Sequence, residues 1–216
     1  MSAAKAHRYL VSFQRLSLVT QDVHSTRYDL GPAALKLGLA SLARLDAVKM
    51  GRERLPALLD ATGHTVALAV WGNHGPTIVH WEESPLASPV YLRLGDVMPL
   101  LSSATGQCFA AFLAQDVQAG LAKVEPLLQQ ELANARKLGR TDVPTTMDGV
   151  HALLAGVRSY GMARVVDTLL PGIVGFCAPV FDADGHLALG IVALGSGATL
   201  DPAWDGPVGG PLRAMA

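Results

Sequence analysis

The sequence predicts an α+β protein in which a mostly antiparallel sheet dominates the larger part of the chain. Half of the 216 residues are hydrophobic and only 16% are charged, so the chain can bury a sizeable core. Strand-like runs fall into two groups, at 65–94 and 163–194, and helical patterns lie before and between these groups. Because the elements are segregated rather than alternating, we expect the helices on one side of the sheet.

The first 31 residues predict a helix followed by a small hairpin. Between Ala6 and Leu16 an apolar residue recurs every three or four positions, and Ser2 is a suitable N-cap for this helix. Two short apolar segments, around 17–22 and 27–31, are separated by a polar loop. We interpret residues 1–31 as a part of a DNA-binding domain.

Residues 32–62 carry the longest helical pattern of the chain. Leucine and valine recur on one face, and a continuous helix would be ~45 Å long. Pro56 is expected to end or bend it. An amphipathic helix between two parts of a protein is typical of a linker or a dimer interface.

Residues 63–200 predict the sheet and its helices. Strands at 65–71 and 76–81 flank a turn at Gly72–Gly75, and a further strand is expected at 90–94. Asp182–Gly185 is a strong hairpin signal between two late strands. The remaining expected elements are helices at 102–113, 116–139 and 145–159, and strands at 163–167, 173–181 and 187–194. The tail that follows is rich in Gly and Pro, and residues 201–216 are expected to be loose.

The charges of the chain are unevenly distributed. Residues 1–60 carry nine Lys and Arg against five Asp and Glu, whereas residues 61–216 carry eight against thirteen. A basic end on an acidic body suits a protein that meets a polyanion with one end only. A recognition helix needs short and cationic side chains at its N-terminal face, and a hairpin wing needs a polar, basic tip. The candidate DNA-contacting residues are Ser2, Ala3, Lys5, His7 and Arg8 on the helix and Ser25, Thr26 and Arg27 on the hairpin. The alternative is an ordinary amphipathic helix with a solvated face.

The segment 95–108 turns through small residues into a helix. Helix N-termini offer free backbone N–H groups and the positive end of a dipole, which favours a carboxylate there. Ser102, Ser103 and Thr105 add hydroxyl groups. A plain N-capped helix is the alternative.

Enzymatic motifs are absent from the sequence. It contains no HExxH, CxxC, GxSxG or P-loop, and no GxGxxG that follows a strand. Cys108 and Cys177 lie among small and apolar neighbours, which indicates buried free thiols in a cytoplasmic protein. No signal peptide opens the chain, and no apolar run approaches the ~20 residues needed to span a bilayer. We therefore expect neither an enzyme nor a membrane protein, and no cofactor or metal.

Several segments in order resemble the isocitrate-lyase-regulator (IclR) family of transcription factors. The segments are SAAKAHRYLVSFQRLSLV, RYDLGPAALKLG, ALLDATGHTVALAV, LRLGDVMPLLSSATGQCFAAFL, LAGVRSYGMA and GFCAPVFDADGHLALGIVALG, which together span roughly residues 2–195. The resemblance implies a winged helix-turn-helix, a linker helix and an effector-binding domain of profilin/GAF-like fold. It also implies dimers or tetramers that act on operator DNA, as repressors or activators.

The chain departs from the family pattern at three places. It begins at the recognition helix, so the two helices that brace this helix in the family are missing, and we expect weak DNA binding by this chain. It stops short of the closing helix of the family. Gln107 stands where the family usually has Lys. A small-molecule-sensing or partner-binding module without DNA binding is the alternative function.

The resemblance also locates an effector pocket. The candidate effector-binding residues are Ser103, Ala104, Thr105, Gly106, Val165, Gly175, Cys177, Val192 and Leu194. The strand positions among them are apolar, so a small dianion would leave oxygens unpaired against these walls. We expect an effector with one anionic or polar end at 103–106 and an apolar body, such as an aromatic acid.

Overall fold

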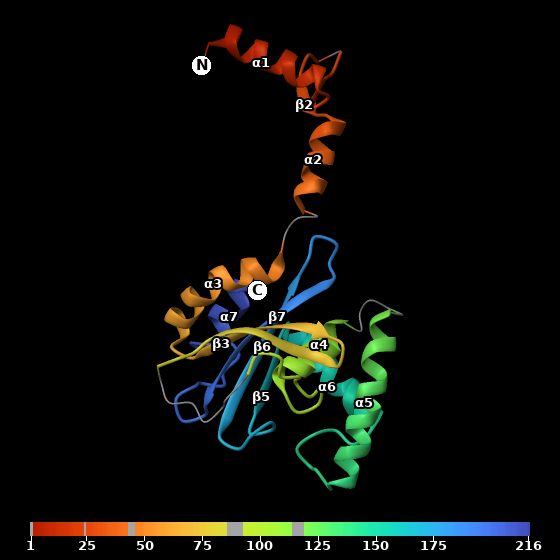
Figure 1. The fold of residues 1–216 in the computed structure, drawn as a ribbon, viewed down its shortest axis with the longest axis vertical. Coiled ribbons are helices and arrows are strands. Elements are labelled where there is room, and N and C mark those ends of the chain that lie inside the picture. Colours follow the sequence, from red (N-terminus) through yellow and green to blue (C-terminus); the bar gives the residue numbers. More distant parts are fainter. Residues whose placement is uncertain (1, 24, 43–45, 86–92, 114–118) are drawn as a thin grey trace. The chain divides into compact units, whose positions relative to one another are not determined.

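The chain forms two compact units that divide after Asp46. The computed structural model describes residues 2–216 except for 24, 43–45, 86–92 and 114–118. The units comprise Met1–Asp46 and Ala47–Ala216 (Figure 1). Their division falls inside the segment predicted to form the linker helix.

The first unit contains the predicted helix and hairpin. Its elements are α1 (Ala3–Arg15), β1 (Val19–Gln21), β2 (Tyr28–Leu30) and α2 (Pro32–Leu42). The two strands are antiparallel, with Thr20 opposite Asp29. Asp22 closes the turn, because its Oδ1 accepts hydrogen bonds from the backbone N–H and the hydroxyl of Ser25 (2.6 and 2.9 Å). Part of the apolar stripe of α1 is exposed within this chain, including Phe13 and Leu16.

The segment predicted as one linker helix contains two helices. Asp46 is not helical, and α3 (Ala47–Thr62) begins directly after it. Aspartate is favoured immediately before a helix, which is consistent with this break. The expected end or bend at Pro56 is not a helix end, because α3 continues through it. Leu55 and Leu58 of α3 are fully buried, and this packing offsets the backbone hydrogen bond that proline cannot form.

The second unit is built on a five-stranded antiparallel sheet, as predicted. The strand order is β4-β3-β7-β6-β5. The strands are β3 (Thr65–Gly72), β4 (Gly75–Glu82), β5 (Ala163–Val166), β6 (Ile173–Phe181) and β7 (Leu187–Ser196). The outer edge of β4 is covered by the segment 95–98, through a bridge between Thr77 and Val97 and backbone hydrogen bonds from Ile78 N–H to Asp96 and from Gly95 N–H to Ile78. The strand expected at 90–94 lies mostly outside the described residues.

Helices cover both faces of the sheet, so the expectation of helices on one side is wrong (Figure 1). One face packs against α4 (Ala104–Leu113), α5 (Ala119–Lys137) and α6 (Met147–Tyr160), and the other against α3 and α7 (Gly209–Met215). Along β6, Cys177 faces the first core while Phe176 and Ala178 face the second. The strands read as continuous apolar runs because both faces are buried.

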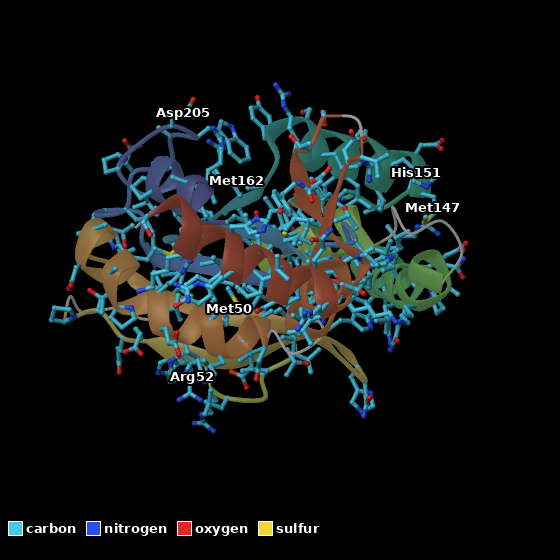
Figure 2. All side chains as sticks on the ribbon, turned by 90° about the horizontal axis from the view of Figure 1, so that it is seen from above. Met50, Arg52, Met147, His151, Met162 and Asp205 are labelled. Atoms are coloured by element: carbon cyan, nitrogen blue, oxygen red, sulfur yellow. The ribbon has the colours of Figure 1, made fainter. Side chains whose placement is uncertain are left out.

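The C-terminal segment is not a loose tail, which corrects the sequence prediction. Residues 209–215 form α7, and Leu200, Val208 and Leu212 are buried with Leu55 and Leu58 of α3. Trp204 stacks on Tyr160 and lies under the Arg164 guanidinium. Asp205, on the outside of this segment in Figure 2, accepts a hydrogen bond from Arg213. Some of the glycines and prolines that suggested flexibility lie in turns, such as Gly206, whereas Gly209, Gly210 and Pro211 form the first turn of α7. Among the described residues no helix is long and apolar enough to cross a membrane.

Candidate effector-binding site

The start of α4 is held by hydrogen bonds among its own small residues. The Ser103 hydroxyl donates to the Pro99 carbonyl (2.7 Å) and accepts from the Gly106 N–H (2.8 Å). Gly106 passes so close to Pro99 that a Cβ there would lie 2.0 Å from the Pro99 carbonyl oxygen. The small residues of this segment therefore allow the backbone at Gly106 to pack closely against the backbone of Pro99 and Leu100.

Three donors at this helix start lack an acceptor within the described part of the chain. They are the backbone N–H groups of Ala104 and Thr105 and the Thr105 hydroxyl. Thr105 is 1% exposed. Every fully enclosed side-chain polar atom of the described residues is hydrogen-bonded, so this hydroxyl borders open space. That space is the adjoining cavity, which Thr105 lines. Partly free N–H groups at a helix start attract anions.

The cavity lies between the α4 start and three strands of the sheet. Val165 of β5, Gly175 of β6 and Leu194 of β7 are adjacent across the strands. Gly175 leaves room here, because a Cβ would come within 3.5 Å of Val165 and 3.8 Å of Ala104. The cavity volume is about 30 Å³, and its mouth is open to solvent. The walls supplied by the strands are apolar.

Most of the predicted effector-binding residues meet at this cavity. Ser103, Ala104, Thr105, Val165, Gly175, Val192 and Leu194 line it, together with Met98, Leu169 and Ile173, which were not predicted. Ile173 shares a face with Gly175 by strand alternation, so the sequence contained that signal. Leu169 comes from the loop between β5 and β6, and its position depends on the fold.

Two predicted residues lie behind the cavity rather than in its wall. Gly106 faces Pro99, as described above. Cys177 packs deeper in the core, where a Cβ on Gly190 would lie 2.8 Å from its Sγ. Burial raises the pKa of the Cys108 thiol, and the neighbouring Cys177 acts in the same direction. The prediction of buried free thiols is confirmed, and a protonated buried thiol is unreactive.

The residue that departs from the family pattern has a structural partner. Gln107 is buried, and its side-chain amide donates to the Leu101 carbonyl (2.9 Å). An amide can therefore occupy this position without an unpaired charge. Glu131 of α5 reaches the same region, where its two oxygens accept the N–H groups of Leu100 (2.6 Å) and Leu101 (2.9 Å). No feature of the sequence pattern predicted this contact.

The candidate DNA-contacting residues all belong to the first unit. Lys5, His7 and Arg8 are exposed on α1, Ser2 is the exposed residue before it, and Ala3 is its first residue. The Ser2 side chain forms no capping hydrogen bond. Ser25, Thr26 and Arg27 are exposed in the turn between β1 and β2. Apart from Ala3, whose side chain lies outside the described part, helix and turn thus present these side chains to solvent, as a DNA-contacting surface requires.

One group of residues has ligand types and spacing suited to a metal within the described part of the chain. Asp182, Asp184 and His186 occupy the exposed turn between β6 and β7. The Asp182 carboxylate already accepts the N–H groups of Asp184 and His186 (both 2.9 Å). These bonds explain the arrangement as a hairpin turn.

Comparison with known proteins places the chain among bacterial regulators. The family model described as "Bacterial transcriptional regulator IclR C-terminal" matches residues 39–200. The glycerol operon regulatory protein of Streptomyces coelicolor is 28% identical over 183 residues, which cover 84% of this chain and 67% of that protein.

Solved structures agree with this placement. The crystal structure of Pseudomonas aeruginosa HmgR is 35% identical, with a TM-score of 0.77, and the match covers all of this chain and 82% of that chain. The Thermotoga maritima IclR structure shares the fold at 20% identity, with a TM-score of 0.64 over the whole chain and 83% of its own. The chain therefore belongs to the IclR family of bacterial transcriptional regulators, which are not enzymes.

Proposed function

We propose that this chain senses a small organic acid in the cavity beneath α4 and couples its binding to affinity for operator DNA. The observation that carries the proposal is the set of three unpaired donors that belong to Ala104 and Thr105, two residues that line a cavity with apolar strand walls. A carboxylate would accept from the N–H groups of Ala104 and Thr105 and from the Thr105 hydroxyl. Charge-assisted bonds of this type are stronger than neutral ones.

The apolar walls favour an acid with an apolar body, such as an aromatic acid. Val165, Val192 and Leu194 offer no side-chain donor to a second carboxylate. The free space is small in this structure, so side chains of the wall must rotate to admit a ring. Met98, with an unbranched side chain, is well suited to do so.

DNA binding is proposed to reside in the first unit, with operator DNA contacted by α1 and the β1–β2 turn. Leu35 and Leu37 of α2 are exposed within this chain. We propose that these leucines are buried against a second copy of the chain in a dimer, or in a tetramer built from dimers. An effector that binds one arrangement of the oligomer more tightly would shift its population and thereby its affinity for DNA.

A thermal-shift screen of the chain against aromatic and aliphatic acids tests this proposal. Phenylacetate or a related aromatic acid is expected to raise the melting temperature in a concentration-dependent way, because a ligand that binds only the folded state stabilises it. Stabilisation by glyoxylate or pyruvate, with none by aromatic acids, would contradict the proposed effector class. No response to any acid would contradict an acid-sensing role.

Thr105→Val is expected to weaken the binding of phenylacetate about tenfold or more. The substitution preserves shape but removes one donor to the carboxylate, and hydrogen bonds to charged groups contribute ~1.5–3 kcal/mol. The melting temperature without ligand should change little, because the hydroxyl has no partner to lose. Isothermal titration calorimetry measures the affinity. Thr20→Val, on the exposed β1 strand, is the matched control.

Gly175→Ala is expected to reduce affinity by occupying the cavity while the fold is retained. The added methyl group would make ordinary contacts at 3.5 Å with Val165 and 3.8 Å with Ala104. The loss should be larger for phenylacetate than for acetate, since the ring needs this space. Equal affinities of the variant and the parent chain for phenylacetate would show that the apolar body lies elsewhere.

A further inference from the structure

A single carboxylate links α5 to the backbone that precedes α4. Oε1 of Glu131 accepts the Leu100 N–H at 2.6 Å, and Oε2 accepts the Leu101 N–H at 2.9 Å. The bonded residues are about 30 positions apart in the chain. Two consecutive backbone donors are thus held by one side chain.

The backbone held in this way is the support of the candidate effector site. The Pro99 carbonyl accepts the hydroxyl and the N–H of Ser103, and the Leu101 carbonyl accepts the Gln107 amide. Gly106 lies directly against Pro99. The placement of residues 99–101 therefore determines where the donors of Ala104 and Thr105 point.

Glu131 is also accessible from the opposite side. It lines a groove of about 210 Å³ between α5 and the segment 97–100, together with His74, Gln130 and Asn134. Met98 lines both this groove and the effector cavity. Protons can reach the Glu131 carboxylate through this groove. Movement of the segment 97–100 would change the shape of both the groove and the effector cavity.

We propose that Glu131 is a positioning residue for effector binding: its ionised carboxylate fixes residues 100 and 101, and its protonation loosens the start of α4. The effect on ligand affinity rests on the proposed function. The effect on the backbone of residues 100 and 101 does not, so NMR of the free chain and ligand binding test the two effects separately.

The surroundings of Glu131 determine the sign of its pH dependence. Burial raises its pKa, while the two backbone N–H groups and the nearby Arg140 oppose this rise. His74 is the other titratable side chain that lines the groove, and residues 97–101 carry none. A protonated carboxyl keeps one carbonyl oxygen as a full acceptor, so one of the two N–H bonds is lost.

Acidification is therefore expected to stabilise the folded chain as a whole while it weakens the two hydrogen bonds of Glu131 to the backbone. The folded state holds the proton more tightly than the unfolded state, so the stabilisation from this group is complete below the unfolded pKa. It is lost as the pH rises through the folded pKa. As the pH rises from 4 to 8, the melting temperature of the parent chain should therefore fall relative to that of Glu131→Gln. The Leu100 and Leu101 bonds, in contrast, are strongest at the upper end of this range.

The experiment follows backbone amide signals by ¹H–¹⁵N NMR from pH 4 to pH 8 and measures phenylacetate binding at the upper end. In the parent chain the Leu100 and Leu101 signals should move with a common midpoint that is raised from the ordinary value of glutamate. Glu131→Gln should abolish this movement and weaken phenylacetate binding about tenfold. Unchanged signals of β6 and β7 verify that the variant is folded. Glu125→Gln, on the exposed side of α5, is the matched control and should behave as the parent chain.

Each outcome decides one part of the proposal. The backbone role is overturned if the Leu100 and Leu101 signals move in Glu131→Gln as they do in the parent chain. It is also overturned if they move in neither protein. Loss of that movement without any loss of phenylacetate affinity overturns the positioning role. Failure of phenylacetate to bind the parent chain, with the titration intact, contradicts the proposed effector class and removes only the ligand part.

Discussion

Gly106→Ala is expected to destabilise the second unit by about 3 kcal/mol and to abolish phenylacetate binding. Its Cβ would lie 2.0 Å from the Pro99 carbonyl oxygen and 2.5 Å from the Leu100 Cα. Both are backbone atoms, so no side-chain rotation can relieve the overlap, and the start of α4 must move away. Ala104 and Thr105, which line the cavity, would move with it. Urea unfolding and calorimetry measure the two effects.

Gly156→Ala is the matched control for this prediction. Gly156 is also a helical glycine, in α6, but nothing lies within 4 Å of the position of its Cβ. The substitution should stabilise the chain by about 0.5–1 kcal/mol through helix propensity. If Gly106→Ala were as stable as the parent chain, the close approach of α4 to Pro99 would be refuted.

Leu212→Ala is expected to cost about 2–5 kcal/mol of the free energy of unfolding. Leu212 of α7 has no exposed surface and packs in the same core as Leu55 and Leu58. A loose tail would lose almost nothing on this truncation, so the measurement discriminates between the sequence prediction and the structure. Chemical denaturation followed by tryptophan fluorescence is suitable, because Trp204 is part of the same core.

The neighbouring residue supplies the control for the tail. Arg213 is exposed and pairs with the exposed Asp205. Arg213→Ala should change stability by no more than about 0.5 kcal/mol, as is usual at surface positions. A comparable loss in both variants would indicate that the helix, rather than the packing of Leu212, provides the stability.

The sequence was most informative where local rules determine structure. Asp182–Gly185 predicted its hairpin correctly because the side chain of Asp182 organises the turn by itself. The predicted strands at 65–71, 76–81, 163–167, 173–181 and 187–194 also correspond to β3 to β7, whereas the strand predicted at 90–94 lies mostly outside the described residues. The two-sided burial of the sheet was missed, although the uninterrupted apolar runs in β6 and β7 were the evidence for it.

Long-range contacts explain what sequence reasoning could not supply. The small residues at 102–106 indicated a helix start suited to an anion, and seven predicted residues lie in one cavity. Glu131 had no recognisable partner, because Leu100 and Leu101 contact it through backbone N–H groups, which every non-proline residue carries. The prediction of a loose tail is wrong for a similar reason, since Leu200, Val208 and Leu212 pack with residues of α3 that are more than 140 positions away in the chain.

The segment 95–98, which covers the edge of β4, ties ligand entry to solubility. The bridge at Thr77 and the bonds of Ile78 occupy backbone groups that would otherwise be open to another strand. An uncovered edge strand is a template for edge-to-edge aggregation. Because Met98 belongs both to this cover and to the cavity wall, a ligand too large for the cavity would displace the cover as well. Under the proposed function, the acceptable size of an effector is therefore limited by the risk of aggregation as well as by affinity.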